Sequence, residues 1–196
     1  MPTRFANFAL SALKGAGPLM IGCVALSGCA AIRHAPLRTV PHVDLERFMG
    51  DWYVIANIPT FVETDAYNAV ESYRLDSDGT IATTFTFREG GFDGEPKRYT
   101  PRGFVLDPSN AIWGMQFVWP FKGDYRIAYV NDDYSQTVVG REKRDYVWIM
   151  ARTPVIPETD YRSLLALLEA QGYDTSKIRK VPQRWGDSTE PVPSQF

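Results

Sequence analysis

The sequence predicts an all-β protein, an eight-stranded antiparallel up-and-down β-barrel with one C-terminal α-helix packed outside it. Two patterns carry this prediction. From residue 50 onward, short runs rich in Tyr, Phe, Trp, Val, Ile and Thr alternate with turn residues, and one stretch of helical periodicity follows the last run. The chain has 196 residues, of which 44% are apolar and 22% are charged, so it can bury one core and a single domain is expected.

Eight runs are predicted as the barrel strands, and short turns separate them. Asp76 to Gly79 forms a turn in which Gly79 can take a positive φ, and Asp107 to Asn110 forms another. Successive antiparallel hairpins of this number close naturally into a barrel. The runs are 51–58, 67–75, 80–88, 98–106, 112–119, 125–131, 135–141 and 146–152.

A single helix is predicted after the last strand. Pro157 suits its first turn and Gly172 offers a stop. One apolar face consists of Tyr161, Leu164, Leu165 and Leu168 at i, i+3, i+4 and i+7. This helix should pack outside the barrel, with a short strand at 177–181 and a C-terminal tail at 186–196.

The first 28 residues are predicted to be a lipoprotein signal peptide. Arg4 and Lys14 precede an apolar run of about 14 residues, and no acidic residue precedes Asp44. A helix that crosses a bilayer needs roughly 20 apolar residues, so a permanent span is the weaker interpretation.

The signal peptide ends in Leu26-Ser27-Gly28-Cys29, which resembles the lipobox of bacterial lipoproteins. This resemblance implies that Cys29 becomes the first residue and carries a diacylglycerol and a further acyl chain such as palmitate, which meets the need for more than one chain in stable anchoring. A plain signal peptide with an incidental cysteine is the alternative, and Cys23 fits the motif less well. Ala30, where an aspartate would retain the protein in the inner membrane, favours the outer membrane.

Residues 29–42 are predicted to be the acylated N-terminus and a flexible tether, because they lack periodicity and contain Pro36 and Pro41. After cleavage, Cys23 is lost and Cys29 is modified, so no disulfide is expected. A small acidic excess argues against nucleic acid as a partner.

Motifs at both ends of the predicted barrel carry a specific resemblance. Gly50-Asp51-Trp52 resembles the Gly-x-Trp signature of the lipocalin family, and residues 131–134 resemble that family's turn between the sixth and seventh strands. Residues 144–154 resemble the end of its eighth strand, whose arginine, here Arg152, packs across the tryptophan. The resemblance covers about 43–185 and is strongest to the anchored bacterial lipocalins, of which residues 44–50 and 119–125 are also typical. Gly50, Trp52 and Arg152 are therefore predicted as structural signature residues.

Strand alternation predicts which side chains enter the barrel. Lipocalin resemblance favours a ligand cavity among them, although the same aromatic side chains could simply fill the core. Tyr129 or Tyr146 could offer a polar contact to a head group. The predicted cavity residues are Val54, Ala56, Phe85, Phe87, Trp113, Met115, Phe117, Tyr125, Ile127, Tyr129, Tyr146, Trp148 and Met150.

Catalytic constellations are sparse. The only histidines, His34 and His42, lie in the predicted tether, so neither a histidine mechanism nor a metal site is expected in the barrel, and no cofactor is expected, although a tyrosine-ligated haem stays open. Adjacent acids in turns, such as Glu63 and Asp65, are expected to be solvated.

The resulting prediction is a membrane-anchored lipocalin without enzyme activity. It would bind, store or transport a fatty acid or lysophospholipid for outer-membrane maintenance, with its barrel facing the periplasm. A lipid- or pigment-modifying enzyme is one alternative, and a strongly raised carboxylate pKa inside the cavity would mark it. A ligand-free envelope interaction module is the other, which predicts no cavity and an aromatic surface patch. A homodimer formed through the barrel mouth is a further option.

Overall fold

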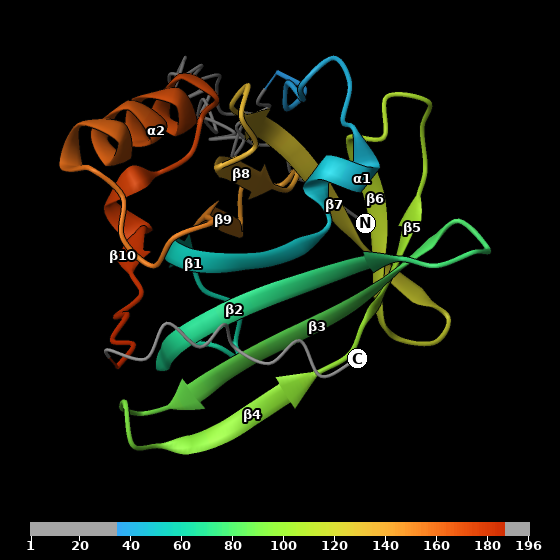
Figure 1. Cartoon of the computed structure of the whole chain (residues 1–196). Helices are drawn as coiled ribbons and strands as arrows, with labels where there is room; N and C mark the ends of the chain where they lie inside the picture. The colour runs from blue at the N-terminus through green and yellow to red at the C-terminus, as the bar shows by residue number, and fades with distance from the viewer. Residues whose placement is uncertain (1–34, 187–196) are drawn as a thin grey trace, which may run out of the picture. The chain divides into compact units, whose positions relative to one another are not determined.

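The computed structural model describes residues 35–186, and the strands in this range curl into one closed antiparallel sheet (Figure 1). Neighbours in the sequence pair in order, and the last barrel strand returns to pair with the first. The predicted closed barrel of eight antiparallel strands is confirmed. Its strands are β1 (Gly50–Ile58), β2 (Ala66–Leu75), β3 (Thr80–Glu89), β4 (Glu95–Tyr99) with β5 (Arg102–Val105), β6 (Ile112–Val118), β7 (Phe121–Val130), β8 (Gln136–Gly140) and β9 (Val147–Ala151).

The fourth predicted strand is broken into two. Both β4 and β5 pair with β3, and Thr100 and Pro101 lie between them. Proline has no N–H to donate to a ladder, and here only its carbonyl is used, by the N–H of Thr83 at 3.2 Å. Strand β7 begins four residues before the predicted start of the sixth strand at 125, because a tight turn joins β7 directly to β6.

The predicted helix is α2 (Glu158–Ala170), and it packs on the outside of the barrel. Its buried residues are Tyr161, Leu164 and Leu168, which pack in one cluster with Ile55 of β1 and Ile149 of β9. Gly172, at a φ of +87°, follows the end of the helix. A short 3₁₀ helix, η1 (Thr175–Lys177), then leads to β10 (Arg179–Lys180), which pairs with β1.

One end of the barrel, called here the closed end, is sealed by α1 (Leu45–Phe48) and the Trp52–Arg152 pair. Trp52 has no exposed surface, and its Nε1 donates to the Phe48 carbonyl at 2.8 Å. The Arg152 guanidinium lies 3.7 Å from the centre of the Trp52 ring and donates to the carbonyls of Asp51 at 2.7 Å and Met49 at 2.8 Å. Arg152 therefore ties the chain entering β1 to the strand that closes the sheet.

The other end, called here the open end, carries the loops at residues 59–65, 90–94, 119–120 and 141–146. The N-terminal segment, residues 35–43, runs from this end along the outside of the barrel. Arg144 donates to the Ala35 carbonyl at 2.7 Å, and the Leu37 N–H contacts the Glu142 carboxylate at 3.2 Å. Farther along, the N–H of Val40 donates to the carbonyl of Ile127 at 3.1 Å.

The prediction of a flexible tether is therefore wrong for residues 35–42. Leu37 is buried against β8 and the α2 cluster, and Val43 is buried at the closed end. These apolar side chains are spaced too irregularly to suggest an element from sequence, yet each finds a site on the barrel wall. Residues 29–34, the signal peptide at 1–28 with Cys29, and the tail beyond Gly186 lie outside the described residues.

Within residues 35–186, no helix is both long and apolar enough to cross a bilayer.

Candidate ligand-binding site

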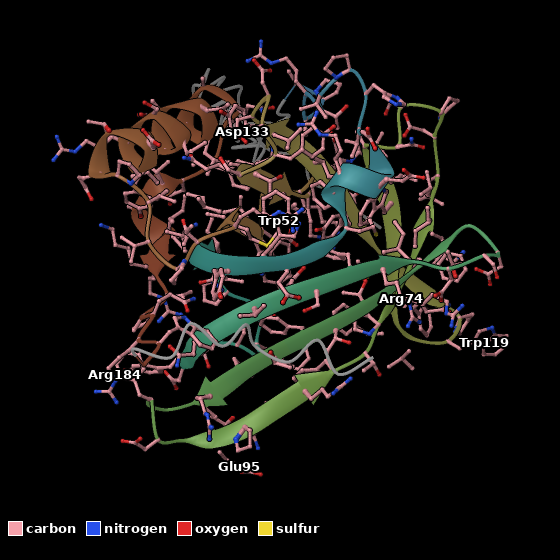
Figure 2. All side chains as sticks on the ribbon, in the orientation of Figure 1. Trp52, Arg74, Glu95, Trp119, Asp133 and Arg184 are labelled. Carbon is pink, nitrogen blue, oxygen red and sulfur yellow. The ribbon has the colours of Figure 1, made fainter. Side chains whose placement is uncertain are left out.

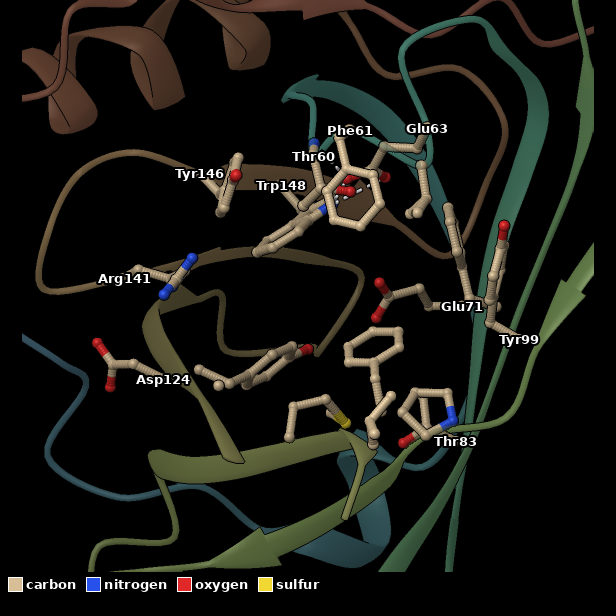
Figure 3. A pocket seen from close by; sticks show the side chains of 18 residues that line it. Thr60, Phe61, Glu63, Glu71, Thr83, Tyr99, Asp124, Arg141, Tyr146 and Trp148 are labelled. Carbon is tan, nitrogen blue, oxygen red and sulfur yellow. Dashed lines mark hydrogen bonds between the residues drawn. The ribbon is translucent and has the colours of Figure 1, made fainter. Parts of the chain in front are cut away.

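The open half of the barrel contains a cavity of about 440 Å³ (Figure 3). Its walls come from β2, β3, β4, β6, β7 and β9 together with Pro101 and the loops at residues 59–65 and 141–146, and most of the lining side chains are aromatic or aliphatic. This volume falls within the usual range of small-molecule sites. A ligand-free interaction module would require a completely filled interior. The barrel interior is not completely filled.

Seven predicted cavity residues do not line the cavity. Five of them, Val54, Phe87, Trp113, Ile127 and Met150, belong to the packed core of the barrel. The other six predictions do line it, and they are Phe85, Met115, Phe117, Tyr125, Tyr146 and Trp148.

The remaining two of the seven residues that do not line the cavity are Ala56 and Tyr129. Both side chains point out of the barrel, so the inward assignment was wrong for them. The β1–β9 register shifts between Val54 and Ala56, and the β7–β8 register shifts between Ile127 and Tyr129. Each irregularity inserts an extra residue and inverts the alternation beyond it. Ala56 and Tyr129 consequently pack in the cluster beneath α2.

An aromatic cluster forms the floor of the cavity and explains why the closed half is solid. Trp113 stacks on Tyr125 with ring centres 5.1 Å apart, and Phe48 meets the edge of Trp113 at 5.5 Å. The hydroxyls of Tyr73 and Tyr125 are 2.6 Å apart, so each satisfies the other in an apolar surrounding.

Glu71 of β2 is the most unusual group in the cavity. The side chain is buried, and its carboxyl points into the cavity in Figure 3. Within residues 35–186 no hydrogen bond or ion pair joins this carboxyl to another side chain or to the backbone. Burial, reinforced by the charge of Glu63, raises the pKa of Glu71 to about 8. At pH 7 the group is therefore mostly a neutral acid.

Glu63 is also buried, which contradicts the expectation that it is solvated. The loop at residues 59–65 folds over the cavity and brings this carboxylate to the N–H of Thr60 at 2.9 Å and to Nε1 of Trp148 at 3.2 Å. Burial raises the pKa of Glu63, and these hydrogen bonds offset part of the rise.

Sequence reasoning missed both glutamates. For Glu71 a signal was present, because Ala69 and Tyr73 enter the barrel core and Glu71 lies between them in the same alternation. A single charged residue on the inward face of a strand is rare enough to mark a site. For Glu63 no such signal exists, since a loop has no periodicity.

The opposite wall carries the cavity's basic group. Arg141 forms an ion pair with Asp145 at 3.3 Å, and its guanidinium lies 5.0 Å from the centre of the Tyr146 ring. Its buried Nε has no hydrogen-bond partner in the described chain. Asp124 on the same wall pairs with Arg126 at 2.9 Å and accepts from the N–H of Glu142 at 2.7 Å.

The described residues contain no candidate metal site. No group of three His, Cys, Asp or Glu side chains in residues 35–186 could hold an ion, and His42 is exposed in the N-terminal segment. What the cavity offers chemically is apolar surface, two buried carboxyls and one arginine.

The cavity opening is surrounded by exposed apolar side chains. Figure 2 shows Trp119 at the periphery of the molecule, far from the buried Trp52. Phe61 is 87% exposed, Trp119 81% and Phe121 76%. Phe117 and Val118, which line the cavity, are also exposed. We call these five residues the rim patch.

The barrel superposes on solved structures of animal proteins. Insecticyanin from the tobacco hornworm Manduca sexta superposes with a TM-score of 0.61 at 14% identity, over 79% of this chain and 87% of that one. Lobster apocrustacyanin A1 superposes with a TM-score of 0.58 at 14% identity, over 71% of this chain and 79% of that one. At such identities the likeness concerns the fold alone.

Sequence comparison is more specific. The outer membrane lipoprotein Blc of Citrobacter freundii is 31% identical over 148 residues, 74% of this chain and 81% of that protein. Temperature-induced lipocalin-1 of Arabidopsis thaliana is 30% identical over 154 residues, 75% of this chain and 83% of that protein. The family model described as a lipocalin-like domain matches residues 43–183. These matches agree with the barrel, its outer helix and the Trp52–Arg152 closure. They show that the chain belongs to the lipocalin family, whose members bind small hydrophobic ligands, and that it is a Blc-like bacterial lipocalin.

Proposed function

We propose that this lipocalin binds a single-chain lipid, a fatty acid or lysophospholipid, and stores or carries it for maintenance of the outer membrane. The observation that carries the proposal is the cavity of about 440 Å³, apolar over most of its wall and open at one end. An acyl chain fits such a site because it is narrow and because each buried CH₂ contributes about 0.8 kcal/mol.

The proposal includes attachment to the outer membrane through an acylated Cys29, with the barrel in the periplasm. The Blc relatives are named outer membrane lipoproteins. Two features of the described chain support a mouth that faces the bilayer. The N-terminal segment begins at the open end, where Arg144 holds Ala35, and the rim patch lies around the same end. Tryptophan is favoured at the boundary between lipid and water, and phenylalanine side chains can enter the acyl layer beneath it.

A binding role is favoured over catalysis, although the raised pKa of Glu71 was the marker expected of a lipid-modifying enzyme. The described lining of the cavity holds no histidine, cysteine or serine, so it offers neither a Ser–His nor a Cys–His pair for nucleophilic catalysis. A neutral carboxyl in an apolar cavity can instead serve as a hydrogen-bonding group for a ligand.

Filling the cavity should weaken lipid binding. Thr83 lines the cavity, whereas its neighbour Thr84 lies on the outward side of β3, so the two residues form a matched pair. We expect Thr83→Phe to weaken binding of a lysophospholipid at least 10-fold, because the ring occupies ligand volume, and Thr84→Phe to leave it unchanged. Titration followed by native mass spectrometry of residues 30–196 measures both. A wild-type protein that binds neither lysophospholipid nor fatty acid would overturn the carrier function.

The anchor is tested by labelling cells with a radioactive fatty acid. We expect label on the wild type and on Cys23→Ser, and no label on Cys29→Ser, because only Cys29 stands at the end of the lipobox. Equal label on both serine variants and the wild type would exclude acylation at Cys29.

A further inference from the structure

Charge is distributed unevenly over the cavity wall. Glu71 and Glu63 lie on one side, and within residues 35–186 no basic side chain forms an ion pair with either. Arg141, the only basic residue among those lining the cavity, lies on the opposite wall and already has Asp145 as a partner. The inner wall is therefore an uncompensated acidic site in an apolar surrounding.

Aromatic rings surround the same two carboxyls. Phe85 is the register partner of Glu71 on β3, and Tyr99 is the partner of Phe85 on β4. Trp148 contacts Glu63 through its indole N–H, and Phe61 lies beside it in Figure 3. Carboxylates combined with aromatic faces are the groups that proteins use to hold organic ammonium ions.

We propose that the cavity selects single-chain amphiphiles with a cationic, ammonium head group, which Glu71 binds directly with Glu63 and the neighbouring rings in support. This inference rests on the proposed lipid-binding function and specifies the head group. A carboxylate head group at the same position would share the single proton of Glu71 beside Glu63, which leaves a negative charge without a basic partner in a medium of low dielectric constant, where such a charge is strongly disfavoured. A carboxylate head group is therefore left with the outer part of the cavity near Arg141.

Binding of an ammonium group is coupled to proton release. At pH 7 Glu71 carries a proton, so the reaction joins R–NH₃⁺ to the neutral acid, forms the ion pair between R–NH₃⁺ and the Glu71 carboxylate, and gives one proton to the buffer. The other titratable groups that face Glu71 across the cavity are Glu63 from the loop at residues 59–65, Tyr125 from β7, Tyr99 from β4, and Tyr146, Asp124 and Arg141 from the opposite wall. Burial, with the charge of Glu71 adding to it, raises the pKa of Tyr125, which therefore stays neutral near pH 7.

The preference is measured with three probes that share one alkyl chain: dodecylammonium, dodecanol and dodecanoate. Each displaces the uncharged fluorophore N-phenyl-1-naphthylamine from the full chain carrying Cys29→Ser at pH 7. We expect dodecylammonium to bind at least 10-fold more tightly than dodecanoate, with dodecanol between them. Equal affinities, or the tightest binding by dodecanoate, would overturn the head-group inference and leave the carrier function standing. If none of the three binds, the carrier function itself fails.

Two variants locate the effect. Glu71→Gln keeps the size of the side chain and removes its charge, and we expect it to bring the ratio of the dodecylammonium and dodecanoate affinities to within about 2-fold of one. Glu46→Gln makes the same chemical change on exposed α1 and should leave the ratio as in the wild type. An undiminished preference in Glu71→Gln would contradict the assignment.

Calorimetry of the protein with native Glu71 supplies a measurement that does not depend on how a variant folds. Titration of dodecylammonium in two buffers of different ionisation enthalpy should report release of close to one proton per bound ligand at pH 7. Dodecanol should release none. Tight binding of dodecylammonium without proton release, together with an undiminished preference in Glu71→Gln, would place the head group away from Glu71 and refute the proposal.

Discussion

Trp52→Ala is expected to lower the free energy of unfolding by about 3–5 kcal/mol, the usual cost of deleting a fully buried aromatic ring. Trp52 has no exposed surface, lies with its ring centre 5.0 Å from that of Phe48, and is covered by the Arg152 guanidinium. The substitution leaves a cavity at the closed end and removes the surface over which Arg152 is held.

Urea unfolding followed by circular dichroism measures this loss. Trp119→Ala is the control, since that side chain is 81% exposed and its removal should change the unfolding free energy by less than about 0.5 kcal/mol. If the two alanine variants are equally stable, Trp52 does not hold the closed end together.

Glu71→Gln is expected to stabilise the protein at pH 7 by up to about 3 kcal/mol and to flatten its pH dependence. The pKa of Glu71 rises from an ordinary 4.5 to about 8 on folding. Below pH 4.5 both the folded and the unfolded states hold the proton, and burial of the carboxyl carries no ionisation penalty.

Between pH 4.5 and 8 the unfolded chain releases this proton while the folded chain keeps it. Stability therefore falls as pH rises, by about 1.4 kcal/mol per pH unit, and the loss is complete above pH 8. Glutamine has nearly the same shape and does not titrate, so the variant escapes this loss.

Unfolding curves at pH 4.5, 7 and 9 test the linkage. The difference between Glu71→Gln and the wild type should be near zero at pH 4.5 and largest at pH 9, whereas Glu46→Gln should follow the wild type throughout. A stability difference independent of pH would mean that Glu71 titrates normally in the folded protein.

The barrel was predictable from sequence because its signals are local. Turn residues such as Gly79 mark strand ends, and the spacing of Tyr161, Leu164 and Leu168 marks the helix, so each could be placed without knowledge of its neighbours. The Trp52–Arg152 closure was predictable for a different reason, since the resemblance to lipocalins supplied the long-range contact.

The interior could be predicted only in part. Alternation places Phe85 and Met115 at the cavity, but it fails beyond an irregularity in a ladder, which is how Ala56 and Tyr129 were misassigned. Such irregularities depend on how two strands pair, at the β1–β9 closure for Ala56 and between β7 and β8 for Tyr129, and no single strand records that. The burial of Glu63 likewise depends on Trp148, 85 positions away.

The N-terminal segment has a kinetic consequence for a protein anchored at Cys29. Five residues separate Cys29 from Ala35, a span of at most about 20 Å, and Ala35 is fixed beside the open end. A mouth confined to this distance meets the bilayer at an effective concentration of the order of millimolar. Lipid capture then becomes a first-order step within one complex, so even a weak affinity of the rim for the membrane keeps ligand exchange fast.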